Sequence, residues 1–102
     1  MKKTFVCSLI CNNGIVGGKI CIEDKSIIYK TNKFTIDKNY KNIVLPIHEI
    51  CDMGWKWIVF PIVTIKMLNN EQYKFIIFNK KRFDKHYTNA KKVLIFQQKQ
   101  TE

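Results

Sequence analysis

The sequence predicts a mainly β fold, in which about seven short antiparallel strands form a curled sheet that one C-terminal helix plugs at one end. Three observations predict it. Before Asn79, apolar and polar residues alternate in short runs, which is typical of strands that bury one face. Residues that favour turns separate these runs. After Asn79, apolar residues recur at three- and four-residue spacing, as they do in an amphipathic helix.

The first third of the chain predicts three short strands. Residues 4–10 alternate between two faces, as expected of a strand that is buried on at least one side. Residues 19–22 and 26–31 predict two more strands, with a polar turn over 23–25 between them. The segment 12–18 contains three glycines and two asparagines, and we interpret it as a turn or bend. These segments together predict a meander.

The middle of the chain is polar and rich in lysine before it becomes apolar again. We expect one edge strand over residues 33–36, followed by a loop. Residues 43–45 predict a compact strand that ends at Pro46. Residues 47–50 predict a single helical turn, because their two isoleucines are three positions apart.

The next part of the chain predicts one long extended segment and a hairpin. Apolar residues alternate over 51–60, and Pro61 ends this segment. Residues 62–67 and 71–78 are expected to pair around the two asparagines at 69–70. Asparagine tolerates the positive φ that tight hairpin turns require.

A helix over residues 79–96 is predicted to complete the fold, with Asn79 as its N-cap. We expect residues 1–96 to form a single domain and residues 97–102 to be a frayed tail. The apolar stripe of the helix, which would face the core, consists of Phe83, Tyr87, Ala90 and Leu94, with Val93 adjoining them.

The chain is strongly basic, with 18 Lys and Arg against 8 Asp and Glu and a net charge of +10. All but one of these cations are lysine, and the exception is Arg82. Proteins that read nucleic acids usually depend on arginine, whose planar guanidinium binds phosphates and base edges through two hydrogen bonds. Lysine excess supports weak attraction to anions. From the composition, we therefore do not favour nucleic-acid binding as the function.

The cysteines and the N-terminal residues predict a cytoplasmic protein. The apolar stretch after Lys3 is short and has no small-residue cleavage site, so it is not expected to act as an export signal. No apolar run approaches the roughly 20 residues that a membrane span needs. Without an oxidising compartment, the four cysteines are expected to be reduced. Cys7 and Cys11 would lie about 13 Å apart on a strand, too far to share a zinc ion.

The sequence offers no catalytic constellation, so we expect a non-enzyme without a metal or cofactor. His48 and His86 are the only histidines, and neither is near a Ser or Cys with an evident partner acid. The carboxylates are few and dispersed, without a pair that suggests acid–base chemistry. No glycine-rich phosphate-binding motif is present.

The residues Trp55-Lys56-Trp57 are the most distinctive local feature, because a strand would point both indoles to one face. They could form an exposed aromatic platform, or one or both rings could cap the core. Cations at the start of a helix oppose its dipole, which suggests an anionic partner. The other candidate binding residues are Lys30 and Lys33 in the middle of the chain, and Lys80, Lys81, Arg82 and Lys85 at the start of the helix.

Three segments carry a resemblance to a known family. They are Gly17-Gly18-Lys19-Ile20-Cys21-Ile22 followed by Ile27-Ile28-Tyr29, then Ile43-Val44-Leu45-Pro46-Ile47-His48-Glu49-Ile50, and finally Tyr73-Lys74-Phe75-Ile76-Ile77-Phe78-Asn79-Lys80-Lys81-Arg82-Phe83.

In this order, residues 14–95 resemble the GRAM domains, which belong to the pleckstrin-homology-like superfamily. The resemblance implies a bent antiparallel barrel of seven strands closed by a C-terminal helix. It also implies binding of membrane lipids or proteins. Glu23 departs from the family, which often has Thr there. Phosphoinositide-binding members of the superfamily carry several cations around the first hairpin, where this chain has Lys19 as the nearest one.

We therefore expect a non-catalytic binding module that engages a protein partner or an anionic membrane lipid surface, with peripheral attachment in the second case. A protein partner could add a strand to an exposed sheet edge. The alternatives are a structural domain that self-associates through Trp55 and Trp57, and, less favoured, single-stranded nucleic-acid binding on aromatic rings among lysines.

Overall fold

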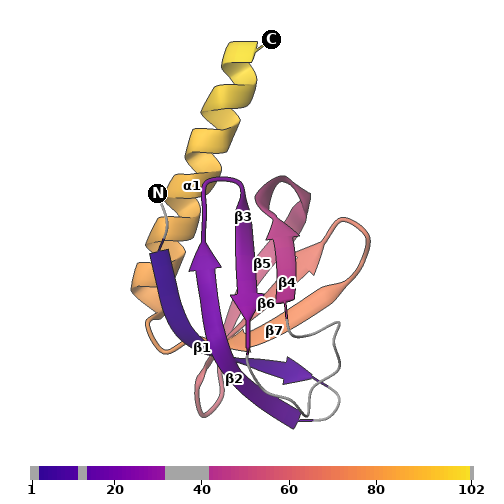
Figure 1. The fold of residues 1–102 in the computed structure, drawn as a ribbon, viewed down its shortest axis with the longest axis vertical. Helices are drawn as coiled ribbons and strands as arrows, with labels where there is room; N and C mark the ends of the chain where they lie inside the picture. Colours follow the sequence, from indigo (N-terminus) through magenta and orange to yellow (C-terminus); the bar gives the residue numbers. More distant parts are fainter. Residues whose placement is uncertain (1–2, 12–13, 32–41, 102) are drawn as a thin grey trace.

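The computed structural model describes residues 3–11, 14–31 and 42–101, with side chains as far as Gln97. Within these residues, seven strands form one antiparallel sheet, and a single helix follows them (Figure 1). The elements are β1 (Lys3–Cys11), β2 (Gly14–Ile22), β3 (Ser26–Lys30), β4 (Asn42–Pro46), the 3-10 helix η2 (Ile47–Glu49), β5 (Ile50–Trp57), β6 (Pro61–Met67), β7 (Gln72–Ile76) and α1 (Lys80–Thr101).

The sheet has the strand order β4-β3-β2-β1-β7-β6-β5, which places β1 at its centre. β1 pairs with β2 along its whole length, from Lys3 opposite Ile22 to Cys11 opposite Gly14. Near its C-terminal end β1 also pairs with β7, where Leu9 lies opposite Phe75. One strand therefore joins the β2–β4 side to the β5–β7 side, and the sheet curls around a common core.

The core consists of the inward-facing residues of this curled sheet and the apolar stripe of α1. The helix lies along one side of the sheet and projects beyond it (Figure 1). The predicted stripe is confirmed at Phe83 and Tyr87, which are buried, and at Ala90 and Leu94, which are half-buried against the core. The adjoining Val93 is exposed instead. The core residues outside α1 are Phe5, Cys7, Leu9, Ile20, Ile22, Ile27, Tyr29, Ile43, Leu45, Ile47, Ile50, Val63, Ile65, Met67, Phe75 and Ile77.

Several local predictions are confirmed. The helical turn predicted over 47–50 is present as η2. The hairpin turn between β6 and β7 contains Asn70 at a φ of 72°, the left-handed conformation that asparagine tolerates. The backbone carbonyl of Asn79 accepts a hydrogen bond from the Phe83 amide at 3.0 Å, so α1 begins where the pattern placed it.

Three boundaries differ from the sequence predictions. The predicted bend over 12–18 is wrong from Gly14 onward, because β2 begins there and pairs with β1. The extended segment predicted over 51–60 ends at Trp57, and residues 58–60 form the turn into β6. The helix continues to Thr101, so the part of the predicted tail before Glu102 is helical. The edge strand predicted over 33–36 lies outside the described residues.

Candidate functional site

A groove of about 520 Å³ lies on the outer face of β1, β2 and β3. The strand register builds it from two rows of outward-facing side chains. In one row Val6, Lys19 and Lys30 lie opposite one another across the three strands. In the other row Thr4, Cys21 and Ile28 are aligned in the same way. The groove thus has an apolar floor with two lysines along it, within the size range of small-ligand sites.

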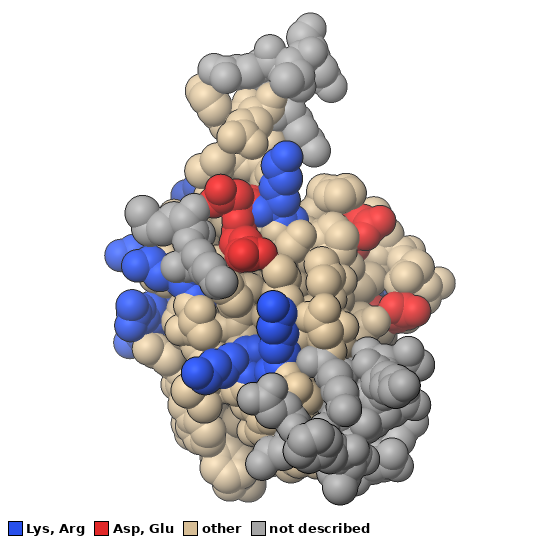
Figure 2. All heavy atoms as spheres, viewed as in Figure 1, with Lys and Arg blue, Asp and Glu red and all other residues tan. Residues whose placement is uncertain are grey.

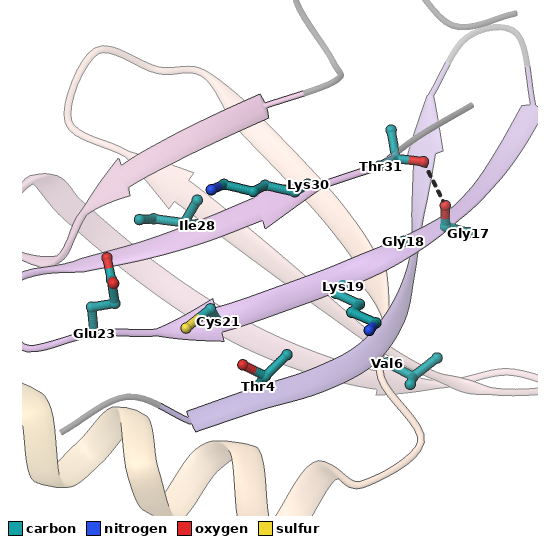
Figure 3. A pocket seen from close by; sticks show the side chains of 10 residues that line it. All are labelled: Thr4, Val6, Gly17, Gly18, Lys19, Cys21, Glu23, Ile28, Lys30 and Thr31. Atoms are coloured by element: carbon teal, nitrogen blue, oxygen red, sulfur yellow. Dashed lines mark hydrogen bonds between the residues drawn. The ribbon is translucent and has the colours of Figure 1, made fainter. Parts of the chain in front are cut away.

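Two adjacent glycines of β2 shape one end of this groove. Gly17 leaves its outer face without a side chain, and its carbonyl accepts a 2.8 Å hydrogen bond from the Thr31 hydroxyl (Figure 3). Gly18 faces inward, where the Tyr29 ring lies against its backbone. The Tyr29 hydroxyl donates a hydrogen bond to the Val16 carbonyl at 3.0 Å. These contacts tie β3 to β2 below the groove.

Lys19 and Lys30 are paired directly across β2 and β3, which places two like charges opposite each other. Such a pair is locally unfavourable unless an anion or solvent screens it. Neither ammonium group has an acidic partner among the described residues. Their side chains turn away from each other, and both line the groove (Figure 3). In the view of Figure 2, Lys or Arg side chains lie near the centre of the visible face.

The groove differs chemically between its two ends. Glu23 lies at the far end from Gly17 and Thr31, and Cys21 lies between (Figure 3). A ligand that fits this arrangement would place an anionic group near the lysines and an apolar part over Val6 and Ile28. A ligand in the opposite orientation, with its anionic group near Glu23, would be repelled.

The structure separates the two candidate tryptophans. Trp55 is half-buried, and its ring makes an edge contact with Phe83 at 5.9 Å. The Lys80 ammonium lies 5.6 Å from the centre of the same ring, a cation–π distance. The Trp55 indole nitrogen is buried and has no hydrogen-bond partner. Trp57, two residues further along, is 73% exposed.

The basic residues at the start of α1 lie on its first turns, and Lys30 does not lie with them. Lys80, Lys81, Arg82 and Lys85 are all exposed on the first turns of α1. Arg82 lies 5.9 Å from the Phe5 ring. Lys30 instead lines the groove over β2 and β3, as described above. Lys33 lies outside the described residues.

An exposed apolar cluster was predicted from the sequence only at Trp57. It comprises the turn between β5 and β6 together with the residue that leaves β7, and we call it the apolar tip. The side chains of all its members are exposed. The apolar tip consists of Trp57, Ile58, Val59, Phe60 and Phe78.

Two signals in the sequence could have revealed these surfaces. Four large apolar residues at 57–60 directly precede Pro61, and a turn between two strands normally contains Gly, Asn, Asp or another polar residue. The predicted strands 19–22 and 26–31 already place Lys19 and Lys30 on neighbouring strands, although their direct pairing follows only from the observed register, in which Ile22 lies opposite Ile27. The sequence contains no comparable signal for the pairing of β1 with the part of β2 that contains the glycines.

Within residues 3–11, 14–31 and 42–97, no polar or charged residue is buried. No three His, Cys, Asp or Glu side chains of these residues are grouped so that they could hold a metal ion. The part of the chain that the structure describes also lacks a helix that combines the length and apolar character needed to cross a bilayer.

Cys7 is predicted to make the fold sensitive to alkaline pH. Burial raises the pKa of its thiol from 9.0 to about 12. Above about pH 9 the unfolded chain loses this proton while the folded chain keeps it, so the free energy of unfolding should fall as pH rises. One such group gives a slope of up to about 1.4 kcal/mol per pH unit. Urea unfolding at a series of pH values measures the slope.

A Cys7→Ala variant is the comparison for this prediction. It should be less stable at neutral pH, because a buried side chain is truncated, but its stability should fall less steeply above about pH 9. Burial also raises the pKa of Tyr29 and of Tyr87, so the comparison is made below the range in which tyrosines ionise. Equal slopes in both proteins would contradict the assignment to Cys7.

Comparisons with known proteins support the fold alone. No protein-family model and no curated protein matches the chain. A solved structure described as the C-terminal domain of an unknown protein from Leishmania infantum is similar, with a TM-score of 0.61 and 14% sequence identity. The similarity covers 93% of this chain and 80% of that one. The curled sheet followed by a helix is therefore an arrangement found in a solved protein.

Proposed function

We propose that this chain is a non-catalytic binding module of the GRAM or pleckstrin-homology-like kind, and that it engages an anionic membrane lipid surface. The groove on β1–β3 would receive the anionic headgroup. The observation that carries this proposal is the cross-strand pair of Lys19 and Lys30, which faces an open groove without an acidic partner among the described residues.

The architecture supports the proposal. The family that residues 14–95 resemble is expected to have seven strands and a C-terminal helix. The described chain has a seven-stranded antiparallel sheet and one helix after it. The element order also agrees with the resemblance, since the motif segments at 17–22, 43–50 and 73–83 fall on β2, on β4 with η2, and on β7 with the start of α1.

The distribution of charge supports an anionic partner. The net charge is +10, and cations occupy both the groove and the first turns of α1. Each lysine near an acidic membrane contributes about 1 kcal/mol of attraction, which fades within a Debye length. Several weak contacts of this kind would give binding that is sensitive to salt.

No polar or charged residue is buried in the part of the chain whose side chains are described, and this supports a non-catalytic role. Catalytic acids, bases and nucleophiles usually have pKa values shifted by burial together with a charged neighbour in a cleft. Cys7 is buried beneath the sheet and its raised pKa keeps it protonated, the opposite of an activated nucleophile. The exposed lysines of the groove are suited to attract an anion.

Reversing the two groove charges should weaken binding to acidic vesicles. We expect a Lys19→Glu/Lys30→Glu variant to bind vesicles of phosphatidylserine and phosphatidylcholine at least about tenfold more weakly, because two attractive contacts become repulsive. Cosedimentation at low and high salt measures this. Vesicles of phosphatidylcholine alone provide the neutral comparison.

A matched control separates the groove from the overall charge. Lys66→Glu/Lys74→Glu changes the net charge by the same amount on two other exposed strand positions, in β6 and β7. It should weaken binding less than the groove variant. Equal losses in both variants would refute the groove as the headgroup site. If the unaltered chain does not bind acidic vesicles at low salt, the membrane proposal is wrong and a protein partner becomes the hypothesis to pursue.

A further inference from the structure

We propose that the apolar tip inserts into the interface of an acidic bilayer and anchors the domain there. The inference rests on the proposed function, which places the anionic headgroup in the groove. It adds that the apolar tip is the part of the domain that enters the membrane. The apolar tip and the groove are built from different strands, so the residues of one can be substituted while those of the other stay unchanged.

The exposure of the apolar tip is unusual for a turn. Val59 is 70% exposed and Phe78 is 67% exposed. A run of four exposed apolar residues is unfavourable in water and is generally retained only where it has a function. Turns that merely connect strands use small or polar residues. Residues 57–60 include neither kind.

The apolar tip is held in place by neighbouring backbone and rings. The Ile77 amide donates a hydrogen bond to the Pro61 carbonyl at 3.1 Å, which joins the exit of β7 to the start of β6. The rings of Phe60 and Phe78 then meet edge to face with centroids 5.4 Å apart. Two segments far apart in sequence therefore present one preformed apolar surface, and little ordering entropy is lost when it binds.

The charges that flank the apolar tip favour an acidic membrane. Lys56 precedes the turn, and Lys80, Lys81 and Arg82 follow Phe78. All four are exposed. The sequence windows 55–62 and 76–83 contain no Asp or Glu. An apolar centre with cations beside it, and with a tryptophan at its margin, matches the layering of acyl chains and anionic headgroups.

A second copy of the chain fits this surface less well. Specific protein interfaces bury roughly 800 Å² on each partner through 20–30 residues. The apolar tip offers five side chains at the end of a hairpin, and a symmetric contact would bring its flanking cations together. Both features favour a bilayer, which receives a protruding tip without needing a complementary shape.

Insertion can be followed with Trp57 itself. The chain has two tryptophans, so a Trp55→Phe variant leaves Trp57 as the only one. On vesicles of phosphatidylserine and phosphatidylcholine, its emission should shift to the blue. Lipids brominated on their acyl chains should quench it. Neither change should occur on vesicles of phosphatidylcholine alone at the same protein concentration.

A matched pair of surface variants tests the role of the apolar tip. Val59→Ser should lower the vesicle partition coefficient by about tenfold, because burying one valine side chain contributes roughly that factor. Leu68→Ser is the control, since Leu68 is 64% exposed in the β6–β7 turn at the other end of β6. It should bind as the unaltered chain does. Thermal unfolding checks that both variants are folded.

Three results would overturn the inference. Salt-sensitive binding without a Trp57 blue shift, and with Val59→Ser unaffected, would leave the proposed function intact but refute insertion. No binding of the unaltered chain to acidic vesicles at low salt would refute both. Concentration-dependent sedimentation of the unaltered chain, abolished by Val59→Ser, would show that the apolar tip is instead an interface between two copies.

Discussion

Phe83→Ala is expected to lower the free energy of unfolding by about 3–5 kcal/mol, the largest effect of any substitution considered. Phe83 has no exposed surface and is the first residue by which α1 enters the core. Its ring meets the Phe5 ring at 5.4 Å and the Trp55 ring at 5.9 Å, both edge to face. Truncation would remove both contacts and leave a cavity between the helix and the sheet.

Urea unfolding, followed by Trp fluorescence and circular dichroism, measures this loss. A domain of this size is typically stable by only about 5–15 kcal/mol, so the variant is expected to unfold at much lower urea. Phe83→Leu keeps most of the volume and should cost less than Phe83→Ala. Thr88→Ala, on the exposed face of the same helix, should stay within about 0.5 kcal/mol. A loss below about 1 kcal/mol for Phe83→Ala would contradict the role of Phe83 as the anchor of α1.

Gly18→Ala and Gly17→Ala are expected to differ sharply, although the two glycines are neighbours. A Cβ atom at Gly18 would lie 2.5 Å from the Lys30 carbonyl oxygen and 2.9 Å from the Tyr29 ring. Backbone of β3 would have to move, so we expect a loss of about 1–3 kcal/mol. A Cβ at Gly17 meets nothing within 4 Å. Gly17→Ala should be neutral, or stabilising by up to about 1 kcal/mol, because alanine restricts the unfolded chain.

The two glycine variants serve as controls for each other, since both change the same chemistry one residue apart. Thermal unfolding of the pair under one set of conditions gives the comparison. Equal stability of the two would contradict the close packing of Tyr29 on Gly18. Because Tyr29 lies beneath the groove, Gly18→Ala should also disturb the amide resonances of β3, whereas Gly17→Ala should not.

The strands and the helix could be predicted because burial of one face imposes a period on the sequence. Alternation located β1, β3, β6 and β7 closely, and the spacing of Phe83 and Tyr87 located α1. The start of β2 could not be predicted in the same way. Glycine favours turns locally, but here pairing with β1 and packing against Tyr29 decide the conformation. Both contacts depend on residues distant in sequence.

For the candidate site, too, the sequence predicts what depends on neighbouring residues and not what depends on contacts between distant ones. Trp55 and Trp57 lie on one strand, β5, as the alternation predicts. Their exposure differs because Trp55 lies against Phe83, whereas Trp57 is the last residue of β5. Lys30 was predicted as a binding candidate, while its partner Lys19 acquires that role only through the register of β2 and β3. The run of apolar residues at 57–60 is a local signal for the apolar tip, but the place of Phe78 in it depends on contact with Phe60 from another part of the chain.

The central position of β1 has a consequence for the order in which the protein folds. β1 completes its pairing only with β7, and the paired residues 8 and 76 are separated by about two-thirds of the chain. During synthesis, β1 to β4 can pair early as a meander, but their apolar face has no cover until β7 and the first turns of α1 leave the ribosome. Such long-range closure slows folding, and it exposes Phe5 and Leu9 to wrong partners in the meantime. Refolding of the full chain should therefore be rate-limited by the closure of β1 on β7, and substitutions in that pair should slow folding more than substitutions in the β2–β3 hairpin.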